Sequence, residues 1–167
     1  MISGCFGNTF LIIVQIFFGL LSALLGFISF FYYLLNHEDY NASIWSLFLG
    51  VNAISLIHLH VLFLKAQIDV WYDKYTFRSL IKFSFVLSIA AIIALPIYIY
   101  LSVKHHEELT LRGYHVDAIF AALSLFWSVN LFCSSRLYSK YVQLTNPALI
   151  ASIESLETPY TFYVDTF

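Results

Sequence analysis

Charged residues are scarce in this sequence. Aspartate, glutamate, lysine and arginine make up 11% of the 167 residues, whereas hydrophobic residues make up 60% and aromatic residues 19%. Soluble domains carry about 25% charged residues. The composition therefore indicates a chain that is surrounded by lipid. The net charge of −2 points to no particular partner, and we expect membrane lipids rather than nucleic acid around the chain.

Cysteine is also scarce, and the motifs of soluble enzymes are missing. Cys5 and Cys133 lie far apart in the sequence, so they predict neither a disulfide framework nor a cysteine metal cluster. The sequence contains no glycine-rich phosphate loop, no nucleophile elbow and no HExxH motif. Its six histidines are too few for the spaced histidine boxes of a di-iron membrane enzyme. We therefore expect a protein that is not an enzyme.

Four long stretches are nearly free of charge, at residues 10–35, 44–64, 83–103 and 116–135. Each reaches the roughly 20 residues that a helix needs to cross a bilayer. Strands of membrane barrels are about half as long and alternate in polarity. We therefore predict an all-α fold, a polytopic membrane protein with a four-transmembrane-helix bundle in residues 1–141 and a tail in residues 142–167. We expect the first stretch to be a retained helix, because it lacks the flanking features of a secretory signal.

Basic residues are concentrated on one side of these helices. The second loop and the segment after the last helix hold Lys65, Lys74, Arg78, Lys82, Arg136 and Lys140. The other two loops hold only Lys104 and Arg112. Because basic loops stay in the cytosol, we predict cytosolic N and C termini, and so a cytosolic tail. Tyr141-Val142-Gln143-Leu144 matches a tyrosine-based sorting signal, so we expect the plasma membrane or an endosomal–lysosomal membrane.

Two histidines, His58 and His60, fall inside the second stretch. Ionisable side chains within a bilayer are costly, and they often mark functional sites. Two residues along a helix correspond to a rotation of about 200°, so the two imidazoles cannot face the same cavity. One interpretation is a structural hydrogen bond to another helix, for example to Asn52, Ser88 or Asn130. The other is axial ligation of heme iron, which a neutral imidazole suits.

A second cluster of ionisable residues lies in the predicted exoplasmic loop and contains His105, His106, Glu107, Glu108 and His115. Adjacent histidines without a second spaced pair or a cysteine make a weak zinc signature. A solvated polar loop is the alternative to a metal site here.

Four short segments follow one another between Ser55 and Tyr141. They are Leu59-His60-Val61-Leu62-Phe63, Ile68-Asp69-Val70-Trp71-Tyr72, the loop from Lys104 to Gly113, and Leu137-Tyr138-Ser139-Lys140-Tyr141. In order and spacing they resemble the motifs of the heme-responsive gene (HRG) family of four-helix heme transporters. Those motifs are a transmembrane histidine, a tryptophan-containing loop, a histidine-bearing exoplasmic loop and the FARKY tail motif. The tail departs from the family, because only its final Lys-Tyr stays in register.

The resemblance implies a transmembrane heme transporter that moves heme, as its transported substrate, from the exoplasmic or endosomal side into the cytosol. His105 or His106 would receive heme, His60 would bind it within the bundle, and Tyr138, Lys140 and Tyr141 would release it. His60 and His106 are the implied ligands of the heme iron, with His58 as the alternative inner ligand.

Four helices enclose little space, so we expect a homo-oligomer, which the resemblance also favours. Small residues in the first stretch, Gly19, Ser22, Ala23 and Gly26, permit close helix contacts. Two other functions stay open: a tetraspan scaffold or trafficking protein with structural histidines, and a proton or metal permease that uses the same histidines.

Overall fold

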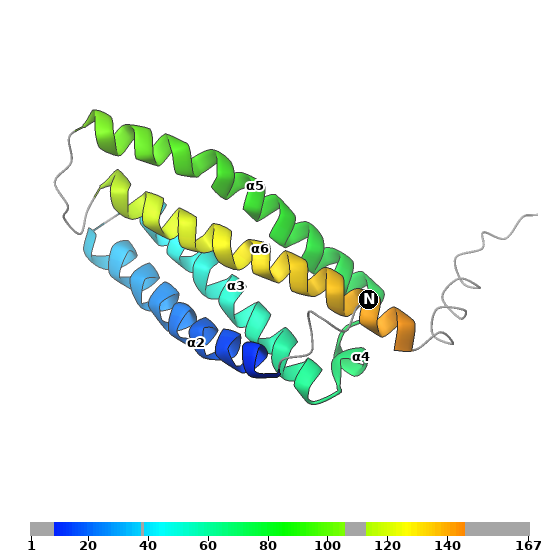
Figure 1. Ribbon diagram of the computed structural model, residues 1–167. Coiled ribbons are helices and arrows are strands. Elements are labelled where there is room, and N and C mark those ends of the chain that lie inside the picture. Colours follow the sequence, from blue (N-terminus) through cyan, green and yellow to red (C-terminus); the bar gives the residue numbers. More distant parts are fainter. Residues whose placement is uncertain (1–8, 38, 106–112, 146–167) are drawn as a thin grey trace, which may run out of the picture.

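The computed structural model describes residues 9–37, 39–105 and 113–145, and these residues are almost entirely helical (Figure 1). The elements are α2 (Thr9–Tyr32), the π-helical turn η1 (Tyr33–His37), α3 (Tyr40–Leu64), α4 (Ile68–Trp71), α5 (Lys74–Lys104) and α6 (Tyr114–Thr145). The predicted all-α fold class is confirmed.

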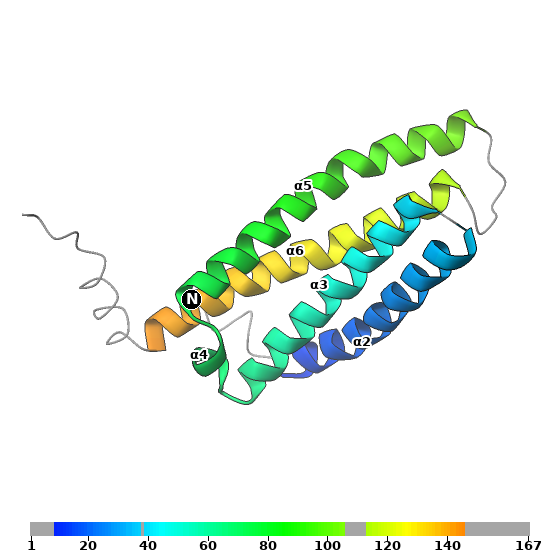
Figure 2. The same cartoon turned by 180° about the vertical axis from the view of Figure 1, so that it is seen from behind.

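Four of the helices are long and apolar enough to cross a membrane. The candidate spans are Thr9–Asn36, Tyr40–Leu64, Lys74–Lys104 and Tyr114–Val142. The chain is therefore a polytopic integral membrane protein with four spans. The start of α2, the short helix α4 and the end of α6 lie at one end of the molecule, which we call the α4 end (Figures 1 and 2). Assignment of this end to the cytosol stays a prediction.

Three helices extend beyond the stretches found in the sequence. α3 begins at Tyr40 rather than at residue 44, α5 begins at Lys74 rather than at residue 83, and α6 continues past residue 135 to Thr145. The sequence argument marked only the segments free of charge, whereas helices continue into the headgroup region, where lysine and arginine extend their charged ends toward water. The predicted loop after α3 also proves to be partly helical, since it contains α4.

The four spans pack in a row rather than around one centre. α2 packs on α3, α3 packs on α6, and α6 packs on α5 (Figure 2). The spans differ in the share of their most apolar part that is buried. This share is 44% for α3 and for α6, but only 22% for α2 and for α5. α3 and α6 are thus the inner helices, and they run in the same direction. The outer helices expose most of their apolar surface to lipid.

Aspartate side chains begin two of the spans. Asp39 accepts a hydrogen bond from the backbone N–H of Ala42 at 3.2 Å, and Asp73 accepts one from Thr76 at 2.7 Å. Such N-caps pair backbone donors that lack partners in the first helical turn. The hydrogen bonds from Thr76 also hold the pKa of Asp73 below its usual value. These caps explain why α3 and α5 begin where they do.

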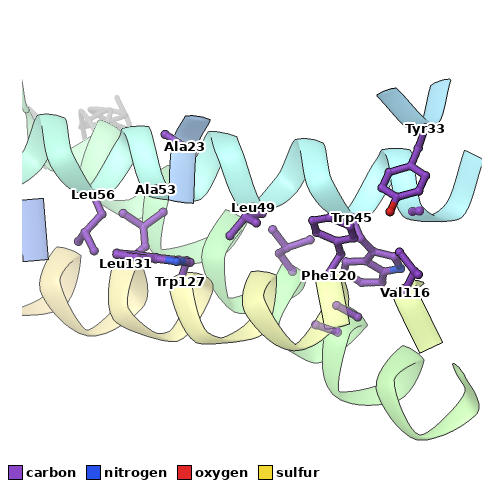
Figure 3. Packing of buried hydrophobic residues seen from close by; sticks show 14 residues of the cluster. Ala23, Tyr33, Trp45, Leu49, Ala53, Leu56, Val116, Phe120, Trp127 and Leu131 are labelled. Atoms are coloured by element: carbon purple, nitrogen blue, oxygen red, sulfur yellow. The ribbon is translucent and has the colours of Figure 1, made fainter. Parts of the chain in front are cut away.

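Two hydrophobic clusters hold the helices together. In the larger cluster Tyr33, Trp45 and Phe120 lie together (Figure 3). The Trp45 indole N–H donates to the hydroxyl of Tyr98 on α5 at 3.1 Å. The smaller cluster lies at the α4 end and consists of Leu59, Leu62, Ile68, Phe77 and Tyr138. Because Ile68 belongs to α4, this cluster anchors the short helix to the ends of α3, α5 and α6.

Candidate functional site

His60 lies in the smaller cluster, near the end of α3. Its Nδ1 atom is 2.7 Å from the hydroxyl oxygen of Tyr138 on α6. The two side chains are 3% and 0% exposed, and their rings meet edge to face with centroids 5.8 Å apart. The other ring nitrogen, Nε2, is buried and has no hydrogen-bond partner among the described residues. The structure therefore brings together two of the predicted site residues, one from each inner helix.

This geometry suits a histidine that binds metal through Nε2. In the tautomer with hydrogen on Nδ1, the imidazole donates to the Tyr138 oxygen and presents the Nε2 lone pair. Histidines that bind metals commonly hold their other nitrogen in such a hydrogen bond, which fixes the tautomer and the ring orientation. In this tautomer the hydroxyl of Tyr138 would hold the His60 imidazole in one orientation.

His58 faces away from the interior of the bundle. The helical period predicts that it points in a different direction from His60. It is exposed, and its Nδ1 atom is 2.9 Å from the hydroxyl oxygen of Tyr72. The ring of Trp71 stands edge-on to it, with centroids 6.4 Å apart. Burial raises the pKa of the Tyr72 hydroxyl above its usual value, so this group stays protonated at neutral pH. The α4 segment thus supplies His58 with a tyrosine partner of its own.

The predicted tail residues do not form one cluster. Tyr138 is fully buried, whereas Lys140 and Tyr141 are exposed on the last turns of α6. Phe63 links the two environments, because its ring centroid lies 4.6 Å from that of Tyr138 and 5.5 Å from that of Tyr141. Aromatic rings therefore continue from the buried His60 to the surface of the α4 end.

The predicted exoplasmic ligands lie at the opposite end of the molecule or outside the described residues. His105 is the exposed C-cap residue of α5, and its ring lies 5.8 Å from that of Tyr114. His106, Glu107 and Glu108 lie outside the described residues. Across the residues that the structure does describe, no group of three or more histidine, cysteine, aspartate or glutamate side chains is placed to hold a metal ion.

The two ends are too far apart for one ligand to touch both. His60 is 20 residues beyond the start of α3, which corresponds to about 30 Å along the helix axis. His60 and His105 therefore belong to separate sites.

The predicted structural hydrogen bond to another helix is confirmed for His60, which meets Tyr138 on α6. The partners named as examples were wrong. Asn52 donates instead to the hydroxyl of Ser128 on α6 at 2.7 Å, while Ser88 and Asn130 donate to carbonyls of their own helices. Sequence reasoning placed Tyr72 and Tyr138 within the proposed motifs, and Tyr138 among the candidate site residues, but did not pair them with His58 and His60. A usable signal is the similar offset along the parallel inner helices, since Asn52–Ser128 are 76 residues apart and His60–Tyr138 are 78 apart.

Comparison of the chain with protein-family models, with curated proteins and with solved structures found no significant match. The residues and contacts described above are therefore the basis for inferring a function. Together they describe an all-α integral membrane protein with four candidate spans and two histidine–tyrosine pairs at the α4 end.

Proposed function

We propose that this chain is a heme transporter that moves heme into the cytosol across the plasma membrane or an endosomal–lysosomal membrane. The observation that carries the proposal is the pair of histidine–tyrosine contacts at the α4 end, His60–Tyr138 and His58–Tyr72. In both, a tyrosine hydroxyl holds Nδ1 and leaves Nε2 for a ligand. We assign this end to the cytosol because of its basic residues.

The chemistry of the α4 end suits an iron porphyrin. A neutral imidazole is a common axial ligand of heme iron, and tyrosine is another known ligand. The porphyrin is flat and largely apolar, so it packs well against aromatic rings such as those of Phe63, Trp71 and Tyr72. Lys140 is exposed nearby on α6 and can attract the carboxylates of heme. The α4 end thus offers imidazoles for the iron, aromatic rings for the porphyrin and a lysine for the carboxylates.

His58 and His60 differ in access, and this difference suggests their order of use. His58 is exposed and can bind a ligand without rearrangement of the helices. His60 on α3 is buried against α6, so binding of a ligand at its Nε2 atom requires these two inner helices to move apart. We propose that His60 binds heme in an open state of the transporter and that His58 binds it at the cytosolic exit.

The opposite end of the molecule would receive heme from the exoplasmic or endosomal side. His105 is exposed there beside Tyr114, and the sequence places His106 next to it. About 30 Å separates this end from His60, so transfer requires movement of the helices or of the heme along them. The sequence holds no nucleotide-binding motif, and we propose no ATP hydrolysis and no other catalysis.

The first test is a heme titration of the detergent-purified full chain, followed by the Soret absorbance band. We expect a saturating Soret shift in the wild type, a weaker shift in His58→Ala, in His60→Ala and in His106→Ala, and the largest loss in the His58→Ala/His60→Ala double variant. His115→Ala is the matched control, because His115 is outside the proposed ligand set.

Other results would contradict the proposal or part of it. A wild type that shows no saturable shift contradicts heme transport and leaves the scaffold or trafficking protein as the best account. A proton or metal permease would likewise bind no heme, but its flux in proteoliposomes would depend on the same histidines. Heme binding that is equal in all variants would reject the assigned ligands.

A further inference from the structure

A groove lies between the outer helix α2 and the inner helix α6. Its volume is about 260 Å³, and its walls include Gln15, Phe18 and Ser22 from α2 and Phe126, Trp127 and Asn130 from α6. Phe18 and Phe126 are exposed. Because the groove lies within two candidate spans, it opens toward lipid.

Two carboxamide side chains face this groove inside the hydrocarbon region. A Cβ atom at Gly19 on α2 would lie 3.7 Å from the ring of Trp127 on α6, so these two residues lie at a common depth. Gln15 is four residues, or about 6 Å, from Gly19 toward the α4 end, and Asn130 is three residues, or about 4.5 Å, from Trp127 in the same direction. The two carboxamides therefore lie at similar depths. Lipid chains offer neither donors nor acceptors, so polar groups within a membrane are normally paired with other protein groups. Two amides open to lipid therefore indicate an absent polar partner.

The hydrogen bonds within the chain leave these amides only partly paired. The Asn130 amide donates to the carbonyl of Phe126 at 2.8 Å, so its Oδ1 atom still lacks a donor. The Gln15 side chain makes no hydrogen bond with any described residue. The groove thus presents a donor on α2 and an acceptor on α6 that do not meet each other.

We propose that the α2–α6 groove is the contact surface for a second copy of this chain. A twofold axis along the membrane normal keeps each residue at its depth and brings the Gln15 amide of each copy to the Asn130 Oδ1 of the other. Two equivalent hydrogen bonds then form across a symmetric interface. An acyl chain would fill the groove but would leave the Gln15 carboxamide and the Asn130 Oδ1 atom without hydrogen bonds.

Cys133 provides a natural reporter for this contact. It is exposed and lies three residues after Asn130, about 60° around α6, on the same exposed side as Phe126. In the symmetric pair, the two copies of Cys133 come close to the twofold axis. An oxidative cross-link between them is therefore expected.

The test uses membranes that contain the full chain with Cys5→Ser, so that Cys133 is the one cysteine left. Oxidation with copper phenanthroline is expected to give a disulfide-linked dimer. The matched control moves the cysteine to α5, with Val86→Cys in the Cys5→Ser/Cys133→Ser background. Val86 is 65% exposed. Its neighbour Phe85 contacts Phe132 on α6, with ring centroids 5.9 Å apart, so the depth of Val86 is similar to that of Cys133. We expect at least tenfold less dimer from this control.

A second variant tests the amides themselves. Gln15→Leu/Asn130→Leu in the Cys133 background is expected to lower the cross-linked fraction at least fivefold, while helix content by circular dichroism stays unchanged. Equal cross-linking from position 86, or cross-linking that survives loss of both amides, would overturn the proposal. A monomeric mass with bound lipid in native mass spectrometry would assign the groove to an acyl chain and would also overturn it. None of these outcomes depends on heme.

Discussion

At the scale of single residues, the two histidines of α3 show how one helix offers two different sites. His60 points between the inner helices and meets Tyr138, whereas His58 points outward and meets Tyr72. The buried pair has the larger structural role, because a buried imidazole nitrogen without a partner costs free energy of folding. The same hydrogen bond would orient His60 for a ligand at Nε2.

Tyr138→Phe is expected to lower the free energy of unfolding by about 1–3 kcal/mol, because it leaves the buried Nδ1 of His60 without a partner. The measurement is reversible unfolding in mixed micelles, followed by circular dichroism. Tyr100→Phe is the control, since Tyr100 is exposed and its hydroxyl makes no hydrogen bond with any of the described residues. Equal stability of the two variants would show that the His60–Tyr138 hydrogen bond contributes nothing to folding.

At the scale of helices, the contact between α2 and α3 depends on glycine. A Cβ atom at Gly26 would lie 2.6 Å from the backbone nitrogen of Gly50 and 2.7 Å from the carbonyl oxygen of Ser46. Both are backbone atoms of α3, so the helices cannot accommodate a side chain without moving apart. The predicted role of small residues in the first span is thus confirmed at Gly26, in a contact within the chain.

Gly26→Ala is expected to destabilise the protein by about 1–3 kcal/mol, because overpacking forces the two backbones apart. Gly19→Ala is the matched control in the same helix. Its Cβ would lie 2.9 Å from Cγ1 and 3.2 Å from Cδ1 of Ile57. These are side-chain atoms, which can shift more easily than the backbone atoms that Gly26 faces. Thermal unfolding in detergent compares the two variants. A Gly19→Ala variant that is the less stable of the two would refute the role assigned to the Gly26–Gly50 contact.

At the scale of the whole molecule, the helices form a row with α3 and α6 inside and α2 and α5 outside. The inner pair carries the buried polar contacts, Asn52–Ser128 and His60–Tyr138. The proposed functions follow this arrangement, because heme would bind along the inner pair while a second copy would bind along α2 and α6. Both proposals depend on four spans in which the start of α2 and the end of α6 lie at the same end of the molecule.

The whole chain is expected to have both ends in the cytosol, because the basic residues gather at the α4 end. Epitope tags fused before residue 1 and after residue 167 are expected to bind antibody only after the cells are permeabilised. A tag inserted after Arg112 at a plasma membrane would bind antibody on intact cells. The reverse pattern would invert the proposed direction of transport.

The sequence by itself determined the number of spans and the fold class. Partition into a bilayer depends on local composition, so charge-free stretches such as residues 44–64 predict helices without knowledge of their neighbours. The helical period also predicted that His58 and His60 face different directions. The helix ends were less predictable, because charged residues such as Lys74 and Lys140 are compatible with helix at the membrane surface.

Only the tertiary structure decided which histidine is buried and which residues it meets. Tyr138 and His60 are 78 residues apart, and their contact arises from the parallel packing of α3 and α6. Tyr72 reaches His58 because the short helix α4 is anchored through Ile68. Such pairings depend on the rotation of each helix about its axis. In water, the contrast between an apolar core and a solvated surface would indicate this rotation. In lipid both sides of a helix are apolar, so the packing between the helices determines it.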